Sequence, residues 1–246
     1  MTKKLFAALN TYRSEVSHSA AMNMAIDEVL LERAELPTIR FYRWSHPALS
    51  FGYFGKFADV AAYARECDLV RRWTGGGIVF HGEDLTYAIV IPRSEPAFAQ
   101  SSMSIYEKIH GALIDALREM GAEAVVAAVI DDGASVTEAS YGKQCFTNPV
   151  QADVMLDGRK IAGAAQRRTR RGLLQQGSIQ LATGRVRPTG GHVDLSNELE
   201  ERFAHALSFE CEMRQLGPEL LERAREIAQQ KYSEDGEKRV TNTHQT

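Results

Sequence analysis

Apolar residues recur every three or four positions in four stretches of the chain, a spacing typical of helices with one buried face. In the clearest stretch the apolar stripe runs from Ile105 to Met120 and ends at Gly121. Ser104 and Glu107 have the spacing of a capping box, so we expect that helix to begin at Ser104. The four predicted helices cover about residues 19–34, 104–120, 196–208 and 218–228.

Short runs rich in β-branched and aromatic residues alternate with these helices and indicate strands. Asp157-Gly158 favours a two-residue hairpin turn, because such turns need positive φ at both positions. The predicted strands and hairpin cover residues 38–44, 49–53, 85–91, 125–130, 152–164 and 173–181. There is no internal repeat or linker, so the pattern predicts one α/β domain over residues 1–232, followed by a polar, disordered tail at 233–246.

Three consecutive glycines, Gly75, Gly76 and Gly77, lie between two predicted strands. Such a run lets the backbone approach a ligand closely and adopt positive φ, while neighbouring arginines supply cationic donors. Neither of the glycine-rich nucleotide-binding patterns is present. With Arg71, Arg72 and His81 so near, we favour a ligand-lining role over the alternative, a simple β-bulge.

Lys160 follows the hairpin turn and precedes the small residues Ala162, Gly163 and Ala164. The absence of bulk there is expected where a ligand lies against the strand. An ordinary exposed lysine is the plain alternative. We expect instead an ammonium that polarises an acyl carbonyl or stabilises the oxyanion formed when the carbonyl is attacked.

Cys145 lies in a polar stretch, two residues after Lys143 and shortly before the hairpin that carries Lys160. Nearby cations favour a thiolate, so this cysteine is the candidate nucleophile, although most cysteines only pack. We predict that Cys67 and Cys211 are packing residues in or beside helices. His81 either orients the substrate, takes a proton from Cys145, or is a structural histidine; the sequence leaves all three open.

The net charge and the positions of the histidines and cysteines exclude several classes of function. The 246 residues carry a net charge of -3 with a pI near 6.2, which argues against nucleic acid as the main partner. The basic turn at residues 167–171 is a solvated turn or a docking point for an acidic partner protein. No histidine spacing suggests a metal site. Three scattered cysteines, no signal segment and no membrane-spanning stretch predict a cytoplasmic protein with no membrane association.

Several separated motifs occur in a fixed order along residues 19–182. They are Asn23-Met24-Ala25-Ile26-Asp27-Glu28, Phe41-Tyr42-Arg43-Trp44, Ser50-Phe51-Gly52-Tyr53, Arg71-Arg72 with Thr74-Gly75-Gly76-Gly77 and His81, Gly158-Arg159-Lys160-Ile161-Ala162-Gly163 with Ala165-Gln166, and Gln176-Gly177-Ser178. In these motifs the chain resembles the lipoate-protein ligase and octanoyltransferase family, which includes the catalytic domains of biotin protein ligases. One departure is Gly55, where relatives often have glutamine.

The resemblance implies an α/β fold of the α+β type, with a mixed, largely antiparallel sheet flanked by helices. It also implies an acyl chain held under the glycine loop, with Lys160 at its carbonyl. The substrate-binding residues expected on this basis are Arg72, Gly75, Gly76, Gly77, Val79, His81, Gly163 and Ala164.

Within the family, one branch transfers octanoyl or lipoyl groups between carrier proteins through a cysteine thioester, and Cys145-Phe146 followed by Pro149 resembles that branch. The resemblance then implies octanoyl-acyl carrier protein as donor, lipoyl domains or glycine-cleavage H protein as acceptors, and no cofactor. Our expectation that no accessory domain follows the catalytic one also favours transfer. The alternatives are an ATP- and magnesium-dependent lipoate ligase, a lipoyl-relay transferase and a non-catalytic acyl- or biotin-binding module.

Overall fold

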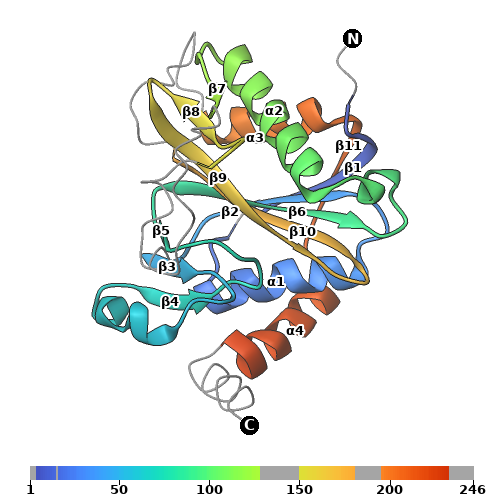
Figure 1. The fold of residues 1–246 in the computed structure, drawn as a ribbon. Helices are drawn as coiled ribbons and strands as arrows, with labels where there is room; N and C mark the ends of the chain where they lie inside the picture. The colour runs from blue at the N-terminus through green and yellow to red at the C-terminus, as the bar shows by residue number, and fades with distance from the viewer. Residues whose placement is uncertain (1–3, 15, 128–149, 181–194, 233–246) are drawn as a thin grey trace.

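The computed structural model describes residues 4–14, 16–127, 150–180 and 195–232. Its main element is an eight-stranded sheet, parallel across its first three strands and antiparallel elsewhere (Figure 1). The strands run in the order β11 (Ser208–Arg214), β1 (Phe6–Arg13), β2 (Thr38–Tyr42), β6 (Asp84–Pro92), β10 (Gly172–Gln180), β9 (Arg159–Arg168), β8 (Val154–Leu156) and β7 (Val125–Val126). The expected mixed, largely antiparallel sheet is therefore confirmed.

A second sheet of three short strands stands beside the first (Figure 1). Its order is β4 (Asp68–Arg71), β3 (Ala48–Phe51) and β5 (Val79–His81), and two 3-10 helices, η1 (Phe57–Asp59) and η2 (Ala61–Arg65), connect β3 to β4. The three glycines lie in the connection from β4 to β5. They are thus in a loop between strands, as expected.

Helices cover both faces of the large sheet (Figure 1). The alternation along β6 explains this, because Leu85, Tyr87 and Ile89 join one apolar cluster while Ala88 and Val90 join the other. The first cluster includes α2 (Ser102–Glu119) and α3 (Leu195–Leu207), and the second includes α1 (Ala20–Arg33) and α4 (Pro218–Ile227), which continues as η5 (Ala228–Tyr232). A short 3-10 helix, η3 (Pro96–Ala99), precedes α2.

The hairpin turn is confirmed: Asp157 and Gly158 have φ values of 50° and 74° and join β8 to β9. The predicted start of α2 was wrong. Ser101, not Ser104, is its N-cap, and the Ser101 hydroxyl accepts a hydrogen bond from the Ser104 N–H at 3.1 Å. Because serine suits either position, the pattern could not distinguish them.

Two further expectations need correction. Cys211 does not lie in or beside a helical stretch but on β11, an edge strand that the sequence pattern does not predict. Phe209 and Met213 of this strand are exposed, so it lacks the apolar alternation of a half-buried strand. The strand predicted at 125–130 is a two-residue strand where it is described. Its residues 128–130, Cys145 and the tail at 233–246 lie outside the described residues. Within the described residues no helix is long and apolar enough to cross a membrane.

Candidate active site

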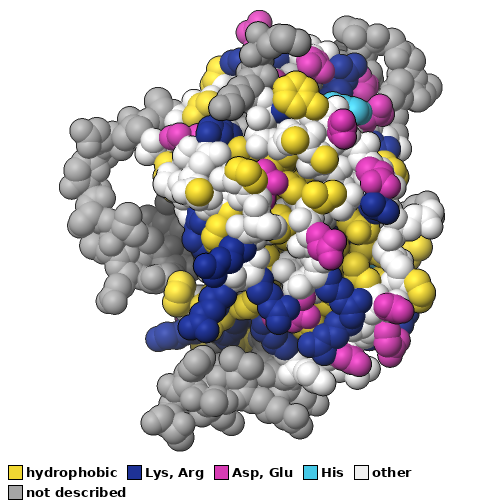
Figure 2. All heavy atoms as spheres, turned by 90° about the vertical axis from the view of Figure 1, so that its right-hand side faces the viewer, with side chains coloured by type: hydrophobic (Ala, Val, Ile, Leu, Met, Phe, Trp, Pro, Cys, Tyr) yellow, Lys and Arg dark blue, Asp and Glu magenta, His cyan; other side chains and the backbone are white. Residues whose placement is uncertain are grey.

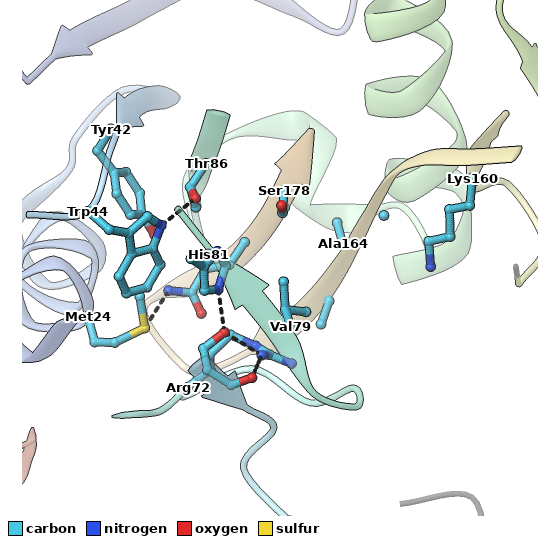
Figure 3. Close-up of a pocket in the computed structure, with 15 residues that line it drawn as sticks. Met24, Tyr42, Trp44, Arg72, Val79, His81, Thr86, Lys160, Ala164 and Ser178 are labelled. Carbon is cyan, nitrogen blue, oxygen red and sulfur yellow. Dashed lines mark hydrogen bonds between the residues drawn. The ribbon is translucent and has the colours of Figure 1, made fainter. Parts of the chain in front are cut away.

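A pocket lies where α1, β5, β9 and β10 approach one another (Figure 3). Its wall is formed by side chains from both sheets and from α1, and by the small residues of β9 that follow Lys160. The lining residues are Met24, Tyr42, Trp44, Ser50, Arg72, Val79, His81, Thr86, Lys160, Gly163, Ala164, Ala165, Gln176, Gly177 and Ser178.

Both ring nitrogens of His81 are held by neighbours. Nδ1 lies 2.8 Å from Asp84 Oδ2, and Nε2 lies 2.6 Å from the Ser50 hydroxyl. The Asp84 carboxylate also accepts hydrogen bonds from the hydroxyls of Thr86, at 2.9 Å, and Ser178, at 2.7 Å. The imidazole stacks on Trp44, with ring centroids 4.1 Å apart.

This network fixes the protonation of His81. Burial, and the nearby Arg72 charge, lower the pKa of His81, against the opposing effect of Asp84. Burial tends to raise the pKa of Asp84, but hydrogen bonds from His81, Ser178 and the Gly82 N–H lower it to about 2. A neutral His81 therefore donates from Nδ1 to an ionised Asp84 and accepts from Ser50 at Nε2. Of the three possibilities left open by the sequence, these contacts favour the structural histidine.

Acid should destabilise the protein through these groups. His81, with a lowered pKa, and His110, whose pKa burial lowers to about 4, both bind protons more weakly when folded, so stability falls as pH drops below about 6.5. Asp84 extends the fall between about pH 4 and about pH 2 by roughly 2 kcal/mol. Urea unfolding at stepped pH measures this. Asp84→Asn should flatten the lower part of the profile, and constant stability from about pH 7 to about pH 3 would contradict the account.

Arg72 lines the pocket and holds the glycine loop in place. Its guanidinium donates to the carbonyl oxygens of Ser50 at 2.8 Å, Gly75 at 3.0 Å and Gly77 at 2.8 Å, and Gly76 has φ of +88°. Of the predicted substrate-binding residues, Arg72, Val79, His81, Gly163 and Ala164 line the pocket, together with Lys160. The three glycines are not among the described lining residues, so their contact with a ligand stays a prediction.

The glycine loop packs backbone against backbone with Gly52. A Cβ atom on Gly52 would lie 2.1 Å from the Gly76 carbonyl oxygen and 2.8 Å from the Gly75 carbonyl carbon. Gly52→Ala should therefore displace the loop and cost about 1–3 kcal/mol or more of unfolding free energy, measured in urea. Gly82→Ala is the matched control, because a Cβ there meets nothing within 4 Å. Equal effects of the two substitutions would refute this packing argument.

A buried polar network supports the wall formed by α1, β2 and β10. Asp27 accepts hydrogen bonds from Arg40 at 2.8 Å, Tyr42 at 2.9 Å and Gln176 at 2.8 Å. The Gln176 amide oxygen in turn accepts from the Thr74 hydroxyl at 2.9 Å, at the start of the glycine loop. Helix α1 is thereby tied to the pocket and to the loop.

Lys160 lies on β9 and lines the pocket (Figure 3). Its ammonium forms an ion pair with Asp153. Its Nζ lies 2.7 Å from Asp153 Oδ2, and the side chains are only 3% and 0% exposed. The plain alternative of an exposed lysine is thus wrong. Asp153, which also accepts a hydrogen bond from Tyr106 at 2.7 Å, was not identified from the sequence. The one indication in the sequence that Asp153 is buried is its position between the apolar residues Ala152 and Val154.

The arginines of the turn at residues 167–171 differ in surroundings. Arg167 lies over the rings of Tyr53 and Trp73, and Arg168 donates to two carbonyl oxygens that precede α2. Arg168, Arg170 and Arg171 are exposed. Figure 2 shows lysine and arginine side chains gathered in the lower half of the face that it presents. The docking of an acidic partner at this turn stays a prediction. No group of three metal-binding side chains occurs among the described residues.

The fold is that of lipoate protein ligases. The structure aligns with an archaeal bipartite ligase from Thermoplasma acidophilum at a TM-score of 0.64 and 20% identity, covering 94% of this chain and 96% of that one. It aligns with lipoate-protein ligase A bound with ATP at a TM-score of 0.66 and 22% identity, covering 91% and 94%. At these identities the likeness establishes the fold alone.

The sequence settles the family. Residues 19–187 match the model of the lipoyl protein ligase A/B catalytic domain, and this chain belongs to that family. Octanoyltransferase LipM of Kyrpidia tusciae is 40% identical over 171 residues, which are 66% of this chain and 62% of the relative. LipM of Oceanobacillus iheyensis is 39% identical, over 66% and 60%. The chain thus spans about three fifths of the length of these curated relatives.

Proposed function

We propose that this protein transfers an octanoyl group from acyl carrier protein to a lysine of a lipoyl domain or of glycine-cleavage H protein. The observation that carries the proposal is a pocket with an apolar wall and the buried ammonium of Lys160 at its edge. Burying each methylene of an acyl chain contributes about 0.8 kcal/mol, and the ammonium suits the carbonyl end. The similarity to octanoyltransferases LipM supports the same reaction.

The reaction proceeds in two steps. The Cys145 thiolate attacks the carbonyl carbon of the octanoyl thioester, Lys160 and backbone N–H groups stabilise the oxyanion, and the C–S bond to the carrier breaks. The carrier thiolate leaves and takes up a proton. The neutral amine of the acceptor lysine then attacks octanoyl-Cys145, a C–N bond forms, the C–S bond to Cys145 breaks, and the amine proton passes to the released thiolate.

This proposal assigns further properties to the chain. The catalytic unit is a single domain over residues 1–232, the protein acts in the cytoplasm, and ATP is not needed because the thioester donor is already activated. Docking of the acidic carrier uses exposed cations such as those of the turn at residues 167–171. The second candidate is an ATP-dependent lipoate ligase, because the matched family is that of lipoyl protein ligase A/B catalytic domains.

A donor comparison separates the two. The protein is incubated with a lipoyl domain and either octanoyl-acyl carrier protein without ATP or free octanoate with ATP and Mg²⁺, and the acceptor is weighed. We expect octanoylated acceptor only with the carrier-bound donor. Product only with octanoate and ATP would overturn the proposal in favour of the ligase.

A further inference from the structure

The side chain of Lys160 runs along its own strand toward Gly163. A Cβ atom on Gly163, three residues further along β9, would lie 2.5 Å from Lys160 Cε and 2.7 Å from Nζ. The missing side chain of Gly163 therefore provides the space that the lysine occupies. Because Gly163 and Ala164 also line the pocket, the ammonium is held against the pocket wall.

The partner of this ammonium is itself fixed from several directions. Asp153 Oδ1 accepts a hydrogen bond from the Tyr106 hydroxyl at 2.7 Å, and Oδ2 accepts one from the Val150 N–H at 2.7 Å. The Tyr106 hydroxyl also accepts from the Ala164 N–H at 3.0 Å. Asp153 therefore has a fixed orientation. Its Oδ2 atom lies 2.7 Å from Lys160 Nζ, and both side chains are buried.

A neutral amine at the position of Lys160 could react with the thioester substrate. The proposed reaction brings an activated thioester carbonyl next to a primary amine, and a neutral amine attacks such a carbonyl to form a stable amide. An ammonium lacks the electron pair that this attack requires. Burial alone favours the neutral form of a lysine, whereas a carboxylate in direct contact favours the charged form.

We propose that Asp153 is a positioning residue that keeps Lys160 as an ammonium and thereby prevents the enzyme from acylating its own lysine. The inference rests on the proposed function. In the step that Asp153 suppresses, neutral Lys160 Nζ attacks the thioester carbonyl carbon, the C–N bond forms and the C–S bond breaks. The thiolate leaves with the proton lost by the amine, and octanoyl-Lys160 remains as a dead-end product.

The test removes the carboxylate charge and looks for that product. Cys145→Ala, with and without Asp153→Asn, is incubated with octanoyl-acyl carrier protein at about pH 7, treated with hydroxylamine to remove thioesters, and mapped by peptide mass. Asp153→Asn should raise octanoyl-Lys160 about tenfold or more, because the carboxylate that contacts the ammonium is lost. Adding Lys160→Arg should abolish the adduct, because arginine stays protonated.

Matched controls separate charge from structural damage. Tyr106→Phe removes one hydrogen bond to Asp153 but keeps the carboxylate, and Asp115→Asn makes the same chemical change at an exposed site on α2. Neither should yield octanoyl-Lys160. An adduct as abundant with Tyr106→Phe as with Asp153→Asn would overturn the proposal, because loosening the site would then suffice.

A second measurement needs no change at Asp153. In Cys145→Ala, Lys160 should stay unmodified from about pH 7 to about pH 9, while the exposed Lys56 gains octanoyl groups over the same range. Faster acylation of Lys160 than of Lys56 at neutral pH would overturn the inference. The unsubstituted protein shows whether the proposed function or only the role of Asp153 fails. If it forms octanoyl-Cys145 but Asp153→Asn forms no octanoyl-Lys160, only the inference fails; if it forms no adduct, the proposed function fails and the inference with it.

Discussion

Lys160→Gln should lower the rate of acyl transfer by about 10²- to 10³-fold, the usual effect of removing one oxyanion donor. The side chain lines the pocket and is buried, so its ammonium acts where water does not compensate for its loss. Because the interaction strengthens as the oxyanion develops, we expect the loss mainly in kcat and little change in KM. Initial rates of transfer at varied concentrations of octanoyl-acyl carrier protein measure both.

Controls for this substitution address the ion pair that it breaks. Removing Lys160 leaves Asp153 buried without this cation, so thermal unfolding should be followed for every variant. Lys160→Arg keeps the charge but replaces a point charge with a planar fork, and should restore stability more fully than activity. If Lys160→Gln is folded and transfers the acyl group at the normal rate, Lys160 does not take part in catalysis.

Arg40→Met should cost about 3–5 kcal/mol of unfolding free energy, because it strands a buried carboxylate. Arg40 and Asp27 are both fully buried and 2.8 Å apart, and burial raises the pKa of Asp27 while the Arg40 charge opposes that rise. The matched control is Arg225→Met, whose pair with Glu222 is exposed and should matter by about 0–1 kcal/mol. Urea unfolding compares the two.

A double variant identifies the cause. Asp27→Leu combined with Arg40→Met removes both charges and should recover much of the stability lost by Arg40→Met alone. Transfer should nevertheless remain impaired, because Asp27 also holds Tyr42 and Gln176 at the pocket wall. If Arg40→Met costs no more than Arg225→Met, this network is not a major source of stability.

Local signals in the sequence predicted local structure well. Helix α1 was predicted at 19–34 and spans Ala20–Arg33 with Ser19 as its cap, and Asp157-Gly158 identified its hairpin because the turn depends on those two residues alone. Strand β11 was missed because its place at the edge, parallel to β1, arises from a partner about two hundred residues away. Propensity within a window cannot supply that information.

The same distinction applies to the site. Lys160, Arg72 and His81 were singled out because they stand beside glycines or turns, and all three line the pocket. Asp84 and Asp153 were missed because an isolated carboxylate in a sequence resembles a surface residue. Their roles depend on distant partners, such as Ser178 for Asp84 and Tyr106 for Asp153, that only the folded sheet brings within hydrogen-bonding distance.

The central claim is that a thioester on Cys145 carries the acyl group, and intact mass measurement tests it most directly. The protein is mixed with octanoyl-acyl carrier protein in the absence of acceptor and weighed before and after hydroxylamine treatment. We predict one octanoyl group per chain, mapped to Cys145, removed by hydroxylamine and absent from Cys145→Ser as a thioester. An unmodified protein that still octanoylates a lipoyl domain, or a hydroxylamine-sensitive octanoyl adduct that forms on Cys145→Ala, would contradict the account.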